Sequence, residues 1–346
     1  MSMRRATSLV GLCLATAAAG LLSPAAAQQW VMPQWVMPRT PDGHPDLQGN
    51  WTNATLTPFE RTAGRGPVYT ADEVATLEAR EAALVLRGAQ PSDPNRAPPT
   101  VASGIGGGSN VGYNYVYIDR GDRVAIVNDE PRASLITNPS DGRRPALTSE
   151  AQQRVAERRE FRSQFGTYDN PEHRPLGERC IVSFGSSTGP PMIPNRWYNN
   201  NYTIVQTADY VMIHTEMVHD TRIIRLGEPE PLPDQVRPWM GDSWGRWEGN
   251  TLVVETTNLN HSQAFRGIAP TDALKVIERF TRVDEETILY EFTMDDPTTY
   301  TQPWGGEVPF TKFDQLLYEY ACHEGNYSLS NILSGARYQE RQAAGN

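Results

Sequence analysis

Four side chains in one short segment have the types and spacing of an acid/base site. The segment Met212–Ile224 contains His214 and Glu216, two positions apart, and then His219 and Arg222. On an extended strand, residues two positions apart project to the same face. A histidine beside a carboxylate can move a proton near neutral pH, because the imidazole titrates there and the carboxylate can orient it.

The chain is expected to turn near residues 218–220, which would bring Arg222 opposite Glu216 on the return strand. An arginine in that position can hold a substrate carboxylate or stabilise a developing oxyanion. The sequence therefore predicts His214 and Glu216 as the acid/base pair, His219 as a helper and Arg222 as the anion holder. The alternative is a surface hairpin with a cross-strand Glu–Arg pair.

The same histidines and glutamate are ligand types that first-row metals accept, with His261 or His323 available as a fourth ligand. Their spacing matches no recognised metal motif, and many sites without a metal share it. We therefore predict a site without a metal. The chain also shows no nicotinamide, flavin or nucleotide motif, so no cofactor is predicted.

Four other residues are predicted to bind the substrate. Asp242 and Trp244 stand just before a strand, where Asp242 is either an acid/base group or, as we favour, a turn cap. Tyr300 and Trp304 suit an aromatic-lined cavity mouth. They follow Asp295-Asp296-Pro297, which is expected to form an Asx-type turn, with a paired-carboxylate site as the alternative.

A series of short strands is expected to position these groups. From Cys180 onward the sequence has a period of two, is rich in Val, Ile, Thr and aromatic residues, and is divided by turn residues such as Gly249-Asn250. The pattern predicts an antiparallel meander that closes, or nearly closes, into a barrel. The predicted strands are Tyr202–Gln206, Tyr210–Glu216, Thr221–Leu226, Thr251–Asn258, Leu274–Val283, Thr287–Met294 and Gly306–Phe310.

The region before these strands is predicted to be an extended and helical elaboration. A proline-rich arm opens this region. Helices are expected over 71–88, with Thr70 as N-cap, and from Ser149 to about Phe165. Two short strands are expected over Tyr113–Ile118 and Val124–Val127. The expected division of the chain is a signal peptide at 1–27, the elaboration at 28–178, the barrel at 179–330 and a tail at 331–346.

The N-terminus predicts export. Arg4-Arg5, an apolar stretch and Ala25-Ala26-Ala27 form the three regions of a secretory signal, and no other segment is long enough to span a membrane. Removing residues 1–27 lowers Lys+Arg from 31 to 29 against 41 acids, so the net charge changes from −10 to −12. This charge argues against a nucleic-acid or anionic-membrane partner, because both require clustered Lys and Arg. We expect a periplasmic or secreted protein without stable membrane insertion, and the sequence leaves its oligomeric state open.

Two cysteines, Cys180 and Cys322, remain after the signal is removed. In an oxidising compartment they are expected to form a disulfide, with two reduced buried thiols as the alternative. Closing so long a loop stabilises the fold by about 4–5 kcal/mol in the chain-entropy model. The bridge is expected to join the two ends of the barrel region.

Four segments of the chain carry a resemblance to a known family: Arg39–Trp51, Glu178–Cys180, Gly241–Val254 and Tyr320–Asn326. Together they resemble a large family of secreted hypothetical proteins, abundant in soil proteobacteria and acidobacteria. The resemblance covers nearly the whole mature chain, and the family has no assigned activity that would supply catalytic residues. The Trp247–Val254 hairpin also resembles a strand pair of lipocalin-like (calycin) barrels, which implies a cup with an internal cavity.

The sequence thus predicts a mainly β protein, an antiparallel calycin-like barrel whose cavity takes a small apolar or aromatic molecule. The leading interpretation is an exported enzyme of the lyase, isomerase or hydrolase type that uses the acid/base residues. The alternative is a lipocalin-like binding protein without catalysis, in which the polar cluster only orients the ligand. A third class, an interaction module, is suggested by the tryptophan-rich arm.

The disulfide can be tested directly. We predict that the denatured mature protein titrates no thiols until reductant is added, and that reduction loosens the barrel before it unfolds the N-terminal elaboration. A thiol-reagent assay under denaturing conditions, with and without reductant, checks the bridge. Equal thiol counts in the two samples would show that the bridge does not exist.

Overall fold

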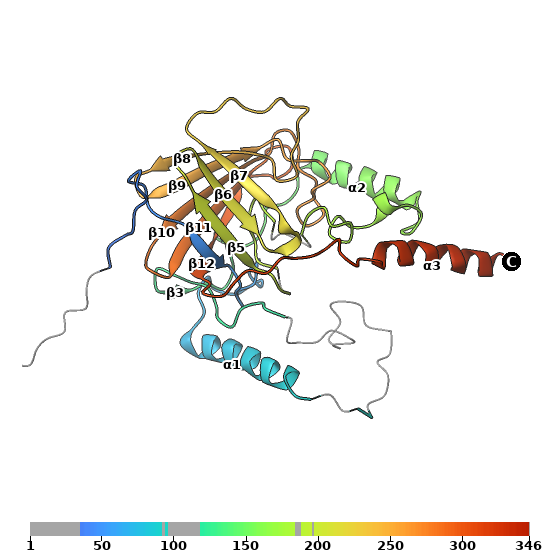
Figure 1. The fold of residues 1–346 in the computed structure, drawn as a ribbon, viewed down its shortest axis with the longest axis horizontal. Helices are drawn as coiled ribbons and strands as arrows, with labels where there is room; N and C mark the ends of the chain where they lie inside the picture. The colour runs from blue at the N-terminus through green and yellow to red at the C-terminus, as the bar shows by residue number, and fades with distance from the viewer. Residues whose placement is uncertain (1–34, 92–93, 96–117, 184–187, 196, 346) are drawn as a thin grey trace, which may run out of the picture. The chain divides into compact units, whose positions relative to one another are not determined.

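The computed structural model of the protein describes residues 35–91, 94–95, 118–183, 188–195 and 197–345 (Figure 1). The predicted signal segment 1–27 and most of the predicted strand Tyr113–Ile118 lie outside the described residues. From Val36 onward, the described residues belong to one compact unit. None of the described helices combines the length and the apolar character that a membrane span requires.

Nine strands pair side by side into a closed barrel, so the mainly β class and the barrel are confirmed. The order around the barrel is β1, β5, β6, β7, β8, β9, β10, β11, β12 and back to β1. The strands are β1 Gly49–Thr52, β5 Asn201–Gln206, β6 Tyr210–Thr215, β7 Thr221–Leu226, β8 Asp242–Glu248, β9 Thr251–Thr257, β10 Lys275–Arg282, β11 Thr287–Asp295 and β12 Trp304–Lys312.

The predicted hairpin at Gly249 is present. β8 and β9 pair in antiparallel register from Glu248 opposite Thr251 to Asp242 opposite Thr257. Gly249 has a φ of 62°, a left-handed conformation that glycine adopts without a steric penalty. The strand β8 itself was not among the predicted strands, although this hairpin implies it.

One pairing departs from the predicted antiparallel meander. β7 and β8 pair in parallel, with Ile224 opposite Ser243 and Leu226 opposite Gly245. Parallel neighbours need a connection that returns to the starting end of the barrel. Residues 227–241 make this return, and they contain the prolines of Glu228–Pro233, which prevent them from adding another central strand. The barrel is therefore mixed.

The barrel closes through a strand that the sequence places in the elaboration. β1 pairs with β5 on one side and with β12 on the other. The predicted boundary at residue 178 thus leaves one barrel strand outside the barrel region. A short strand, β4 (Ile136–Asn138), pairs with the start of β12, and β2 (Ile126–Val127) pairs with β3 (Glu130–Pro131) as a separate ribbon.

The barrel interior is filled by side chains. Along each strand, alternate residues are buried, as in Ile288, Tyr290, Phe292 and Met294 of β11. These residues belong to one core cluster that runs through the barrel. A filled interior differs from the cup with an internal cavity that the calycin resemblance implies.

An ion pair lies almost fully buried in the core. Arg222 on β7 donates to both carboxylate oxygens of Glu278 on β10, at 2.6 and 3.0 Å, and the side chains are 3 % and 0 % exposed. Tyr290 donates its hydroxyl to Glu278 at 2.9 Å and accepts the backbone N–H of Met192. Burial alone would lower the pKa of Arg222, but Glu278 outweighs burial and raises it.

The described part of the chain forms three α-helices, which lie outside the barrel wall. α1 (Ala71–Gly88) begins at Thr70, which forms a capping box with Glu73, and α2 (Ser149–Ser163) begins at Thr148. Both confirm the predicted helices to within two residues. α3 (Ser328–Ala343) occupies most of the predicted tail and has no buried residue.

The disulfide between Cys180 and Cys322 is present, with a Cα–Cα distance of 5.7 Å. Cys180 precedes β5 and Cys322 follows β12, as predicted. The bridge packs against Met217 and Val218 of the β6–β7 turn. It therefore attaches the segments that flank the barrel to one particular turn at the barrel end.

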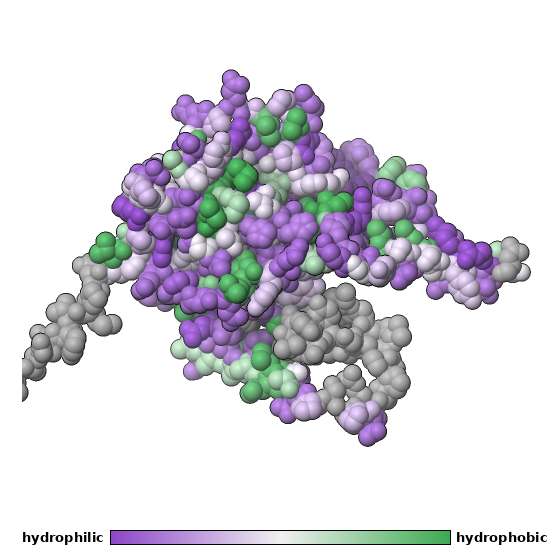
Figure 2. Space-filling view, in the orientation of Figure 1, coloured by the Kyte–Doolittle hydropathy of each residue, from purple (hydrophilic) through white to green (hydrophobic). Residues whose placement is uncertain are grey.

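The outer surface is largely polar. Figure 2 shows hydrophilic side chains over most of the visible face, with hydrophobic ones in small separate patches. Lysine and arginine number 31 against 41 aspartate and glutamate residues in the whole chain. Scattered apolar side chains of this kind are normal for a protein surface.

The buried ion pair leads to a stability prediction. Arg222→Met leaves the Glu278 carboxylate charged and uncompensated in the core, so we expect it to lower the free energy of unfolding by about 3–5 kcal/mol. The double variant Arg222→Met/Glu278→Leu removes both charges and should recover most of this loss. Urea unfolding followed by circular dichroism measures both values. A double variant less stable than the single one would contradict the prediction.

Candidate functional site

His214 and Glu216 do not share a face. β6 ends at Thr215, and Glu216 begins the 3-10 turn Met217–His219. Ile213 and Thr215 are buried inside the barrel, so the alternation of the strand directs His214 outward. The predicted acid/base geometry inside a cavity is therefore wrong, because the strand is one residue shorter than expected.

His214 lies half-buried on the outer wall. Its Nδ1 is 3.0 Å from the hydroxyl oxygen of Thr221 on β7. Burial and the nearby His219 lower the pKa of His214. A neutral imidazole bonded to a threonine has a structural role in the hairpin, and its predicted catalytic role is untested.

Glu216 is buried at the turn. Its carboxylate accepts a hydrogen bond of 2.8 Å from Asn201 Nδ2, and its backbone N–H donates to Asn201 O. Burial raises its pKa, while bonds from Asn201 and Asn199 oppose the rise. Glu216 thus joins the turn to the start of β5.

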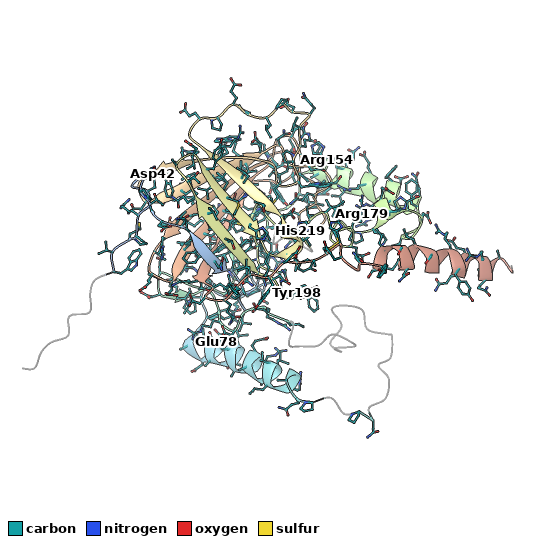
Figure 3. All side chains as sticks on the ribbon, viewed as in Figure 1. Asp42, Glu78, Arg154, Arg179, Tyr198 and His219 are labelled. Carbon is teal, nitrogen blue, oxygen red and sulfur yellow. A yellow bond between two sulfur atoms is a disulfide. The ribbon has the colours of Figure 1, made fainter. Side chains whose placement is uncertain are left out.

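The turn that follows is strained. Val218 and His219 have φ values of 65° and 62°, and Val218 is fully buried. A β-branched residue in the left-handed region is an outlier, and each such residue costs about 1–3 kcal/mol. The turn presents His219 to solvent, 6.0 Å between ring centroids from His323, which follows Cys322 (Figure 3).

Asp220 closes this turn and is the titratable group that sequence reasoning missed. Burial raises its pKa to about 6, although His219 and a bond from Thr188 oppose the rise. Its Oδ2 is buried, and no described group donates to it. Thr188 also exchanges hydrogen bonds with Ser183, whose backbone N–H donates to the Thr188 hydroxyl at 2.9 Å. The segment 184–187 between them lies outside the described residues.

Arg222 belongs to a different environment. Arg222 points into the barrel and pairs with Glu278, so it does not face Glu216. The geometry therefore contradicts both predictions for Arg222, as the anion holder and as a surface partner of Glu216. The reason is the register: Arg222 stands opposite Ile213, an inward residue. Within the described part of the chain, no three His, Cys, Asp or Glu side chains gather as a metal site.

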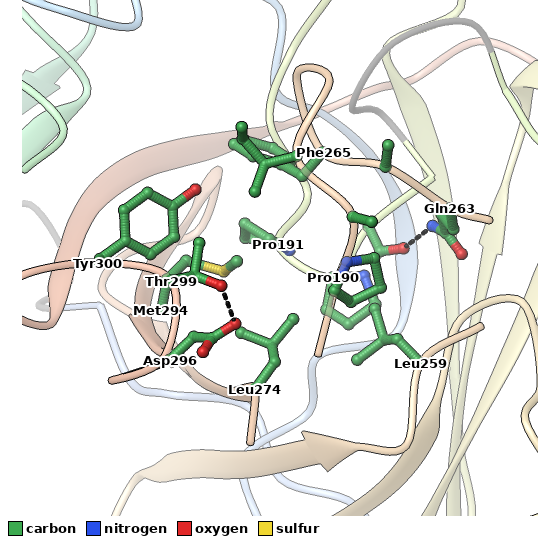
Figure 4. A pocket seen from close by; sticks show the side chains of 15 residues that line it. Pro190, Pro191, Leu259, Gln263, Phe265, Leu274, Met294, Asp296, Thr299 and Tyr300 are labelled. Carbon is green, nitrogen blue, oxygen red and sulfur yellow. Dashed lines mark hydrogen bonds between the residues drawn. The ribbon is translucent and has the colours of Figure 1, made fainter. Parts of the chain in front are cut away.

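A small pocket lies at the same end of the barrel (Figure 4). Three segments supply most of its lining, at 189–191, 259–274 and 294–300, and its free volume is about 40 Å³. That volume holds roughly three water-sized groups. The lining residues are Gly189, Pro190, Pro191, Leu259, Gln263, Ala264, Phe265, Ile268, Ala269, Pro270, Leu274, Met294, Asp296, Thr299 and Tyr300.

The carboxylate in this pocket is fully engaged. Asp296 Oδ1 accepts from the backbone N–H and hydroxyl of Thr298, and Oδ2 accepts from the hydroxyls of Thr271 and Thr299 at 2.9 and 2.7 Å. The hydrogen bond from the backbone N–H of Thr298, two residues after Asp296, confirms the predicted Asx-type turn. Asp296 therefore holds the pocket wall in shape.

Two of the four predicted substrate-binding residues come together here. Tyr300 lines the pocket, and Trp304 packs behind it at 5.6 Å between ring centroids. Burial raises the pKa of the Tyr300 hydroxyl. Gln263 Nε2 donates to Gly189 O at 3.0 Å and ties the loop 259–274 to the segment 188–191.

Asp242 and Trp244 lie elsewhere, on the outer face of β8. The Asp242 carboxylate pairs with Arg225 at 2.5 Å and accepts the backbone N–H of Leu232 at 2.8 Å. It thereby fixes the connection that precedes β8. Asp242 therefore has a structural role. Its carboxylate bonds the backbone of Leu232, whereas the predicted turn cap would bond the backbone two residues after Asp242. The apolar pocket residues missed by sequence reasoning, such as Pro190 and Leu259, carry no local signal because they come from separate loops.

Comparison of the chain with protein-family models, curated proteins and solved structures found no match in any of the three. The resemblance to secreted bacterial proteins therefore stays a prediction from the motifs of the chain. The site has to be interpreted from its own geometry.

Asp220 gives a pH-dependent prediction. Its pKa in the folded protein is about 6, above the 3.8 of an unperturbed aspartate, so its ionisation destabilises the fold as pH rises from about 4 to above 6. Asp220→Asn should therefore unfold about 2 °C higher at pH 7.5, equivalent to about 1 kcal/mol after allowance for solvent screening, and show no gain at pH 3.5. Thermal unfolding at both pH values tests this, and a pH-independent difference would refute it.

Proposed function

We propose that the protein is an exported binding protein for a small apolar or aromatic molecule, and that the pocket at the barrel end is its site. The observation that carries this proposal is the lining: proline, leucine, isoleucine, methionine and phenylalanine side chains surround a few polar groups. Ligand sites typically combine such an apolar wall with few orienting groups.

The polar groups of the pocket favour binding over acid/base chemistry. Asp296 already accepts from three threonines, and Gln263 donates to Gly189. The hydroxyl of Tyr300 stands at the pocket wall and can orient a ligand (Figure 4), as can Gln263 Oε1, which is buried with no partner among the described residues. A phenolic hydroxyl with a raised pKa is a hydrogen-bond donor at neutral pH.

The size of the pocket limits what enters without rearrangement. A free volume of about 40 Å³ accepts a short alkyl group or the edge of a ring. A complete aromatic ring requires the loop 259–274 to move outward. The closed barrel beneath it supplies the rigid wall against which such a loop can close.

Export and the lipocalin-like character form part of the proposal. The disulfide between Cys180 and Cys322 is typical of oxidising compartments such as the periplasm or the extracellular space. The resemblance of the Trp247–Val254 hairpin to calycin barrels supports a carrier, with the ligand at the barrel end instead of the interior.

A second candidate is an acid/base enzyme at the same end. Asp220, with a pKa of about 6, contacts Thr188, and Thr188 immediately precedes the pocket residue Gly189. A carboxyl group that titrates near neutral pH can act as a general acid or base. Turnover of an aromatic ligand by the wild type, and its loss in Asp220→Asn, would favour this lyase, isomerase or hydrolase function over simple binding.

Two alanines of one loop provide a matched test. Ala264 lines the pocket, whereas Ala273 is exposed outside it. We expect phenol to bind the wild type saturably and Ala264→Trp to weaken that binding at least tenfold, because the indole fills the pocket. Ala273→Trp should bind as the wild type does. Ligand-observed NMR titration with phenol, and with cyclohexanol as a non-aromatic probe, measures the three affinities.

The outcomes are distinct. Equal affinities for the two tryptophan variants would place any binding outside the pocket and contradict the proposal. Saturable binding of neither probe to the wild type would do the same. Circular dichroism of both variants verifies that the barrel is intact.

A further inference from the structure

A second hollow lies between α2 and the loop that covers the pocket. Its volume is about 380 Å³, and it is lined by Arg154, Val155 and Arg158 of α2 and by residues 267–272 with His261. It shares only Ile268–Pro270 with the barrel-end pocket. A ligand of this hollow would therefore be distinct from the ligand proposed for the barrel-end pocket.

Three arginines lie along one side of α2. Arg154, Arg158 and Arg162 are four positions apart, so they are neighbours on one helix face, where like charges repel. Arg154 is neutralised and held: it pairs with Glu150 at 2.6 Å and donates to Thr298 O and Thr299 Oγ1. Figure 3 labels Arg154 on this helix.

Arg158 has no such partner. It is half-buried, and within the described residues its guanidinium forms neither an ion pair nor a side-chain hydrogen bond. Burial and the charge of Arg162 both lower the pKa of Arg158, so the positive charge of Arg158 is unfavourable in the folded protein. An anion in the hollow would offset both penalties by its attraction to the guanidinium.

The carboxylate across the hollow does not neutralise Arg158. Asp272 accepts from Arg237 at 2.9 Å and from His261 at 2.8 Å. Arg237 and His261 therefore already pair with the Asp272 carboxylate. The remaining lining, Val155 with Ile268 and Pro270, is apolar and reduces screening by water.

We propose that this hollow, defined by Arg158 and the loop 267–272, binds a small oxyanion, either a carboxylate or a phosphate. A guanidinium offers a planar fork of donors that matches two oxygens of either group. The apolar part of the lining suits an anion attached to a small organic group.

Titration calorimetry at low ionic strength, with inorganic phosphate and with acetate as separate probes, tests this. We expect the wild type to bind at least one of them saturably with a Kd of about 1–5 mM. Arg158→Gln should weaken that binding at least tenfold, and added salt should weaken it too. Arg159→Gln is the matched control, because the adjacent arginine is exposed and does not line the hollow.

A thermal-shift measurement gives an independent result. Arg158→Gln removes a repelling charge, so without anion its Tm should equal or exceed that of the wild type, and phosphate or acetate should no longer raise it. Arg158→Lys keeps the charge without the fork and should bind with intermediate affinity. Binding to the wild type by phosphate alone or acetate alone identifies the oxyanion. Equal binding by wild type and Arg158→Gln, or no saturable binding of either probe, would overturn the proposal.

Discussion

The closure of the barrel by β1 is the constraint on which the rest of the structure depends. The strands from β5 to β12 form a sheet with two edges, and β1 pairs with both. Its residues Gly49–Thr52 pair with β5, and Trp51 and Thr52 also pair with β12. An open edge exposes unpaired backbone groups and invites association. Trp51 of β1 enters the core and donates its indole N–H to Leu47 O at 3.0 Å. Once closed, the barrel fixes the positions of all the loops at its ends.

A filled interior then determines where chemistry is possible. The core is apolar except for groups such as Arg222, Glu278 and Tyr290, which are buried and bond to one another. The disulfide, the strained turn at Val218 and the loop over the pocket all lie at one end of the barrel. Strain is retained where surrounding structure enforces it, and here the disulfide packs on the strained residue.

Local patterns predicted local structure well. The cap at Thr70, the periodicity of seven strands and the turn at Gly249 depend on neighbours in sequence, and each is present. The site was predicted less well. A strand one residue shorter than expected moved Glu216 off the face it was to share with His214, and the register placed Arg222 inside the barrel. A shift of one residue reverses the side of a strand that a side chain occupies.

The sequence by itself determined seven of the nine barrel strands, the helices α1 and α2 and the cysteine pairing. Hydrophobic periodicity and turn residues are local signals, and the presence of two cysteines after residue 27 is a matter of composition. Only the tertiary structure decided three other features: the parallel contact of β7 with β8, the closure by β1, and the assembly of a pocket from three separate segments. Each depends on residues far apart in the chain, and the pairing that brings them together is selected by burial of the whole core rather than by any local pattern.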